Sequence, residues 1–169
     1  VSTGSLHHLS DPRRGIAALA DCLRPDGVAA IMVYAKYGRI GVEAMQSVFQ
    51  DLALRQDDQS IRTVKEAIAN LPETHPARAY MGLARDLNSD AGWVDTYLHG
   101  REASYSIDEC IDLVASAGLV FQDLFFKSPY YPPINSPSAF HSRVAALQQS
   151  KQWSIMERVN FSNACHFFT

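Results

Sequence analysis

The sequence predicts an α/β domain with a mostly parallel sheet, interrupted by a long helical insertion. Residues 28–34 (VAAIMVY) form an unbroken apolar run, as expected of a strand that helices cover on both faces. Residues 1–34 read as strand, helix and strand, the size of a βαβ unit. Residues 37–104 are too many for an ordinary connection, and they show helical periodicity.

The first βαβ unit has clear helix boundaries. Residues 1–6 are expected to be the end of a strand. Asp11 is a preferred N-cap, and Pro12 is a preferred first helical residue because its missing N–H would be unpaired there anyway. The turn at 25–27 (PDG) ends the helix, since proline cannot continue it and glycine accepts a positive φ.

The segment 37–104 carries two apolar stripes at helical spacing, and prolines at 72 and 76 break the pattern after them. We expect this segment to be a helical insertion or lid that packs over one end of the sheet. The stripes consist of Val42, Met45, Val48, Phe49 and Leu52, and of Ile61, Val64, Ile68 and Leu71.

The last part of the chain returns to the core pattern. Residues 106–109 (SIDE) predict a capping box, in which serine and glutamate satisfy each other's backbone N–H groups. A strand over 119–126, a proline-rich loop over 128–137 with short helices after it, and a closing strand over 164–169 should follow. The predicted organisation is core over 1–36, insertion over 37–104 and core over 105–169.

Composition excludes several classes of function. The 169 residues are 47% hydrophobic and carry a net charge of −3, so no basic footprint predicts binding to nucleic acid or to an anionic membrane. No apolar run reaches the roughly 20 residues of a membrane span. Three scattered cysteines, odd in number, favour a reducing, cytoplasmic setting.

Three segments together resemble class I S-adenosylmethionine (SAM) dependent methyltransferases. Residues 2–34 (STGSLHHLSDPRRGIAALADCLRPDGVAAIMVY) resemble the fourth strand, the following helix and the fifth strand of that family. Residues 105–119 (YSIDECIDLVASAGL) are similar to the helix before its sixth strand, and 165–169 (CHFFT) to its closing strand.

The resemblance implies a C-terminal half of the family's Rossmann-like sheet. The family order is 3-2-1-4-5-7-6 with strand 7 antiparallel, so this chain should contribute strands 4-5-7-6. The family's Gly-rich turn and the acidic residue that binds the cofactor ribose belong to the other half. The first strand would then present an exposed edge, and we expect a homodimer through it.

The same resemblance implies where the site lies, because open α/β sheets bind ligands at the carboxyl ends of their strands. His8 would orient or deprotonate the acceptor, since a neutral imidazole can take a proton near pH 7. Structural roles for both histidines and a solvated loop after residue 34 remain the alternatives. A metal site is not expected, because no third ligand lies at zinc-like spacing. The implied cofactor-binding residues are Thr3, Gly4, Ser5, Leu6 and His7, and the candidate substrate-binding residues are Tyr34, Tyr37 and Arg39.

The expected function is transfer of a methyl group from SAM to a small-molecule acceptor, with no nucleic-acid or membrane partner. A non-catalytic module for dimerisation or protein binding, derived from the same fold, is the alternative. A different nucleotide-binding α/β enzyme is a third possibility, since fold alone does not fix chemistry.

Overall fold

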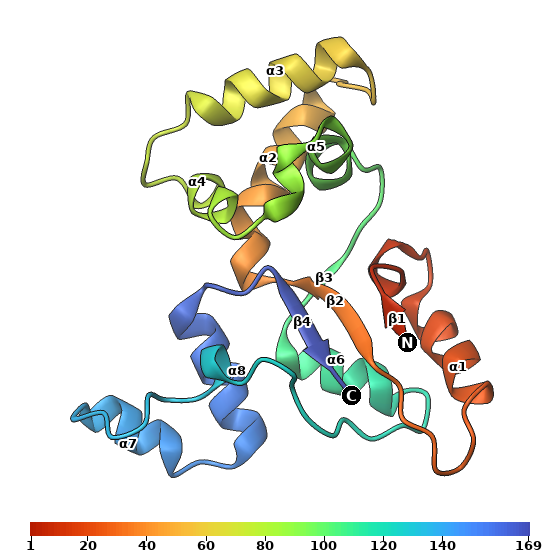
Figure 1. Ribbon diagram of the computed structural model, residues 1–169, viewed down its shortest axis with the longest axis vertical. Helices are drawn as coiled ribbons and strands as arrows, with labels where there is room; N and C mark the ends of the chain where they lie inside the picture. The colour runs from red at the N-terminus through yellow and green to blue at the C-terminus, as the bar shows by residue number, and fades with distance from the viewer. The chain divides into compact units, whose positions relative to one another are not determined.

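The computed structural model describes residues 1–169, the side chain of Arg85 excepted. It divides the chain into two compact units, which are described separately here: an α/β unit of Val1–Tyr37 and Ala103–Thr169, and a helical unit of Gly38–Glu102 (Figure 1). Across the described residues, no helix has the length and apolar character needed to cross a bilayer.

The elements follow one another in the order of the chain. The α/β unit contains β1 (Ser2–Thr3), η1 (Leu6–His8), α1 (Pro12–Asp21), β2 (Ile31–Ala35), β3 (Ser104–Tyr105), α6 (Ile107–Ala115), η4 (Ser128–Tyr130), α7 (Ala139–Ala145), α8 (Gln149–Asn160) and β4 (Cys165–Phe168). The helical unit contains α2 (Ile40–Asp51), α3 (Asp58–Ala69), α4 (Pro76–Met81), η3 (Arg85–Asn88) and α5 (Asp90–Tyr97), and η2 (Tyr37–Arg39) leads into it.

Strand β2 is the centre of the sheet. It pairs in parallel with β1, in the register Ser2 to Ile31, and with β3, in the register Tyr34 to Ser104. Strand β4 pairs with β2 in the antiparallel direction, from Ile31 opposite Phe168 onward. The predicted α/β class with an antiparallel final strand is therefore confirmed.

The predicted strand over 119–126 is wrong as a regular strand. This segment makes an isolated antiparallel bridge between Leu124 and Phe168, and the Phe125 N–H donates to the Phe167 carbonyl at 3.0 Å. It lies beside β4, as the expected order requires. Val120 is 73% exposed and Phe126 64% exposed, so the apolar run is not covered on both faces as a central strand would be.

The predicted helix caps of α1 and α6 are confirmed. The Asp11 carboxylate accepts from the Arg14 N–H at 3.0 Å, with Pro12 in the first turn. Ser106 Oγ accepts from the Glu109 N–H at 3.2 Å, and Glu109 Oε2 accepts from the Ser106 N–H at 2.7 Å. This capping box fixes where α6 begins, directly after β3.

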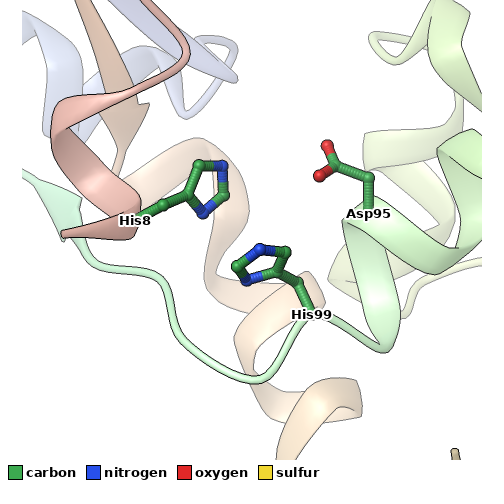
Figure 2. Close-up of side chains that lie close together, drawn as sticks. All are labelled: His8, Asp95 and His99. Carbon is green, nitrogen blue, oxygen red and sulfur yellow. The ribbon is translucent and has the colours of Figure 1, made fainter. Parts of the chain in front are cut away.

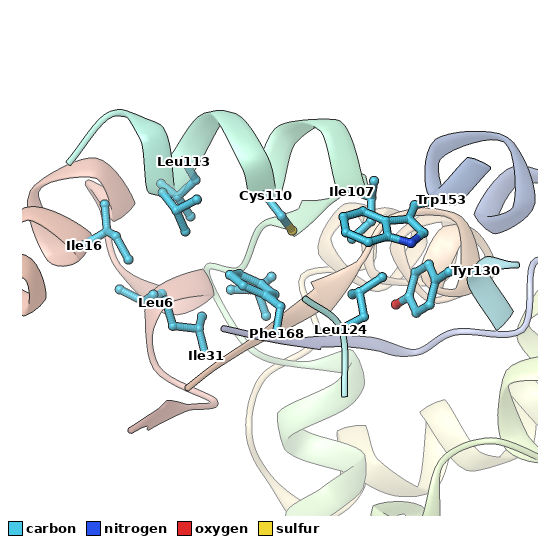
Figure 3. Packing of buried hydrophobic residues seen from close by; sticks show 12 residues of the cluster. Leu6, Ile16, Ile31, Ile107, Cys110, Leu113, Leu124, Tyr130, Trp153 and Phe168 are labelled. Carbon is cyan, nitrogen blue, oxygen red and sulfur yellow. The ribbon is translucent and has the colours of Figure 1, made fainter. Parts of the chain in front are cut away.

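The core of the α/β unit lies between α6 and the sheet. Figure 3 shows Ile107, Cys110 and Leu113 of α6 facing Phe168 and Leu124, and all five are buried. Each such side chain contributes about 1.5–3 kcal/mol by leaving water, so this layer holds the sheet edge in place.

The helical unit has its own core. Of the predicted stripe on α2, Val42, Met45 and Phe49 are buried, whereas Val48 and Leu52 are exposed. The stripe on α3 is buried at 61, 64 and 68. The amphipathic pattern thus found the helices, but it overestimated the width of the covered face of α2.

Candidate functional site

The carboxyl end of β1 turns sharply into η1. Gly4 takes a φ of +72°, which side chains rarely adopt, so a glycine suits this position. The turn leaves Thr3 and Ser5 exposed and buries Leu6 and His7 completely or almost so. Of the residues predicted to bind a cofactor, residues 3–5 are therefore open to solvent. The buried side chains of Leu6 and His7 hold this stretch against the core.

Three predicted site residues come together at this end of the sheet. The rings of His7 and Tyr34 lie 3.8 Å apart between centroids, and His8 meets Tyr34 edge to face at 5.7 Å. The His7 carbonyl also accepts from the Ala103 N–H at 2.8 Å, where the chain re-enters the α/β unit. His7 is fully buried and His8 is half-buried, so His8 is the imidazole of the pair that is open to a ligand.

Lys36, two residues after Tyr34, forms an ion pair with Glu109 of α6. Lys36 Nζ lies 2.5 Å from Glu109 Oε1, and both side chains are partly exposed. Burial raises the pKa of Glu109, but the hydrogen bonds from Lys36 and Ser106 outweigh it and leave the pKa below its usual range. The carboxylate is thus a fixed negative charge in the first turn of α6.

Tyr37 contacts a residue that the sequence did not point to. Its ring lies 5.7 Å from that of Phe161, which ends α8 with a φ of +52°. A bulky residue in the left-handed region is uncommon and marks local strain. No residue-level pattern around position 161 signals this conformation.

Arg39 lies in the helical unit, where it is buried. Its guanidinium donates to the Tyr80 hydroxyl at 2.7 Å and to Glu102 at 2.5 Å, and Gln46 donates to the same carboxylate oxygen at 2.6 Å. The assignment of Arg39 to substrate binding stays a prediction. The contacts that the structure gives it are those of a residue that holds the helical unit together.

A buried hydrogen-bonded group, centred on His166, lies at the ends of β2 and β3. His166 Nε2 donates to the Tyr105 carbonyl at 2.8 Å, so its Nδ1 accepts from the Tyr130 hydroxyl at 2.6 Å. The same Tyr105 carbonyl accepts from the Lys36 N–H at 2.9 Å. His166 thereby fixes the ends of β2 and β3. The alternation in residues 165–168 places 166 and 168 on one buried face, and this signal could have found it.

Glu157 lies against His166 in this group, with Oε2 3.5 Å from Nε2. Its Oε1 accepts from the Ile107 N–H at the start of α6. Burial raises the pKa of Glu157 to about 7, against the opposing effect of that hydrogen bond. Burial lowers the pKa of His166 to about 4, so at neutral pH the imidazole is uncharged.

Two further polar residues, Asp95 and His99, lie in the helical unit. Asp95 is on α5, and His99 follows it, accepting from the Arg101 N–H at 3.2 Å through Nδ1. Figure 2 shows these side chains and that of His8, which closes η1 in the α/β unit.

The carboxyl end of β1 leaves room for a ligand beside its backbone. The space beside Gly4 is open except for the Met32 Cε, 3.9 Å from where a Cβ would stand, so a ligand can approach the backbone there. Thr3, Ser5 and His8 supply polar groups next to it. The carboxylate of Glu109 is already paired with Lys36, so no free acid for the ribose hydroxyls is supplied by this pair.

Comparison with solved structures finds the same fold in part of a known protein. PKMT2 of Rickettsia typhi, a methyltransferase, matches 99% of this chain with a TM-score of 0.72 and 12% identity. Its complex with AdoHcy matches 98% with a TM-score of 0.71 and 15% identity. At these identities the likeness shows the fold, which is that of part of a methyltransferase.

Comparison of sequences gives a relative that covers most of this chain. An uncharacterized protein of Synechococcus sp. is 28% identical in an alignment of 164 residues that covers 91% of this chain. No protein-family model matches. The chain spans 39% of that relative and 33% of PKMT2, so it corresponds to part of each.

Proposed function

We propose that this chain carries the acceptor-side wall of a SAM-dependent methyltransferase. The observation that supports it most is the meeting of His7, His8 and Tyr34 at the carboxyl end of a half-sheet whose fold matches PKMT2. Ligands of open α/β sheets bind at that end. The likeness to the AdoHcy complex supports SAM as the cofactor.

Each residue then has a defined task. SAM supplies a methyl group on a sulfonium centre, which is already a good leaving group, so the protein mainly positions and shields the reactants. The backbone of 3–5 lines the cofactor. His8 accepts a proton from the acceptor. The rings of His7 and Tyr34, with centroids 4.3 Å and 5.7 Å from that of His8, hold its imidazole in place.

The choice of acceptor is supported by the comparison rather than by composition. The sequence alone favoured a small molecule as the acceptor. The similarity to PKMT2, a protein lysine methyltransferase, favours an amine on a protein. An ammonium must lose a proton before it can attack a methyl group, which gives His8 its role.

Titration of the ¹⁵N-labelled chain with S-adenosylhomocysteine tests the proposal, because NMR detects even weak binding to half of a site. We expect amide shifts confined to residues 3–8 and 34–37. Gly4→Val should abolish them, since its backbone has a positive φ, whereas Gly100→Val, in open space, should not. Absent shifts in a folded chain would reject the proposal.

The non-catalytic alternative rests on β1. Among the described strands β1 pairs with β2 alone, and Val1 is 93% exposed. We propose that a second copy pairs with this edge. Light scattering should give a dimer that Val1→Lys dissociates, whereas Val28→Lys, at another exposed position, leaves it intact. A monomeric wild-type chain removes this proposal.

A further inference from the structure

A large groove lies in the α/β unit, apart from the histidine site. It opens between the proline-rich loop after η4 and the helices α7 and α8, and its volume is about 1150 Å³. Met156, 1% exposed, lies at its base. Tyr131 and Pro133 line it from the loop, and His141 and Ala145 from α7.

Hydrogen bonds within the chain hold the walls of the groove in shape. Gln149 donates to the Tyr131 hydroxyl at 2.6 Å, and Asn160 donates to the Pro129 carbonyl at 2.7 Å. Ser136 Oγ and His141 Nδ1 lie 2.6 Å apart. A groove built this way loses little entropy when a ligand enters, which favours binding.

The lining of the groove is neutral. None of its described lining residues is an acid, and Lys127 at the rim is held by Asp123 at 2.6 Å. Between apolar surfaces it presents the hydroxyls and amide of Ser128, Asn135 and Ser162. Such a mixture matches an extended polypeptide, whose N–H and C=O groups alternate with side chains. The volume exceeds the roughly 300–1,000 Å³ of ordinary small-molecule pockets.

One residue, Phe161, connects the groove to the carboxyl end of β2. Asn160 and Ser162 line the groove, and Phe161 between them contacts Tyr37 just beyond the carboxyl end of β2. The backbone of Phe161 is in the left-handed region, so the orientation of its ring depends on a strained conformation. Strain of about 1–3 kcal/mol is retained where the surrounding structure over-determines it, often at ligand sites.

We propose that this groove binds an extended, uncharged polypeptide segment that flanks the methylated residue of a protein acceptor. The inference rests on the proposed function for its biological meaning. Binding in the groove would add a second contact that determines specificity, at a distance from the reacting amine. This binding can be measured without the cofactor and without methyl transfer.

Peptide capture on the immobilised 169-residue chain tests the groove directly. The probe is a pool of synthetic dodecapeptides with one central lysine and randomised uncharged neighbours, quantified by mass spectrometry. Ala145→Trp should fill the groove and reduce capture at least tenfold. Ala146→Trp, at the next exposed position and outside the groove lining, should retain wild-type capture.

The outcomes separate this proposal from the previous one. Capture that Ala145→Trp alone abolishes supports the groove, whether or not S-adenosylhomocysteine binds. Equal capture by both variants, or none by the wild-type chain, overturns it while leaving the cofactor result standing. A wild-type dimer that Ala145→Trp dissociates would also overturn it, since a second copy would then be the occupant.

Discussion

The two units each contain a buried polar group, but the groups differ in charge. In the helical unit, Arg39 and Glu102 form an ion pair whose side chains are 1% and 7% exposed. In the α/β unit, His166 is buried with Glu157, and burial drives both toward their neutral forms. Full charges are costly to bury and must be paired, whereas neutral groups need only hydrogen bonds. The two units should therefore respond differently to mutation and to pH.

The chain offers a reporter for each unit. Trp93 is buried in the helical unit and Trp153 in the α/β unit, and the chain has two tryptophans in all. Trp93→Phe and Trp153→Phe backgrounds therefore allow the unfolding of each unit to be followed by fluorescence. Because a chain of two units can unfold in more than one transition, each unit is followed by its own tryptophan.

The largest expected effect is on the charged pair. Arg39→Met leaves the Glu102 carboxylate buried without its partner, which should cost the helical unit about 3–5 kcal/mol. Urea unfolding followed by Trp93 measures it. Arg62→Met, at an exposed position, should change stability by less than about 0.5 kcal/mol. Adding Glu102→Gln to Arg39→Met should restore part of the loss, and equal effects of the two arginine variants would contradict the argument.

The contribution of His166 and Glu157 to the stability of the α/β unit should depend on pH. A raised pKa makes Glu157 stabilising below about pH 4.5 and progressively less so up to about pH 7. A lowered pKa makes His166 contribute least below about pH 4 and progressively more up to about pH 6.5. In the wild-type chain these slopes oppose each other between pH 4.5 and 6.5.

Single variants separate the two slopes. Relative to wild type, His166→Gln should make stability fall as pH rises, and Glu157→Gln should make it rise, each by at most about 1.4 kcal/mol per pH unit. Asp108 and Glu109 raise the pKa of Glu157 and Arg158 lowers it, so these residues stay unchanged. Urea midpoints followed by Trp153 give the result, and parallel pH profiles for all three proteins would refute it.

The same contrast explains what the sequence could predict. Local rules located the capping box at Ser106 and the start of α1 at Pro12, because the signal lies within four residues. Apolar periodicity found β2 and β4. It failed at 119–126, where an apolar run lies at a sheet edge. Pairings between distant residues, such as Lys36 with Glu109, leave no local pattern, although motif order placed His7, His8 and Tyr34 at one sheet end.

The smallest expected effect concerns backbone strain, and each unit again offers one case. Ala53 follows α2 with a φ of +52°, and Phe161 follows α8 with the same φ. Glycine adopts this region without strain, so Ala53→Gly should stabilise the helical unit by about 0.5–1 kcal/mol, less the extra entropy of the unfolded chain.

Phe161→Gly relieves the same strain but removes the ring that contacts Tyr37. The gain and the loss should nearly cancel, leaving the stability of the α/β unit, read from Trp153, within about 0.5 kcal/mol of wild type. Peptide capture should nevertheless fall, because Phe161 lies between Asn160 and Ser162, which line the groove. A clear gain in stability with unchanged capture would mean that Phe161 is merely a strained helix end, equivalent to Ala53, and that its ring has no part in peptide binding.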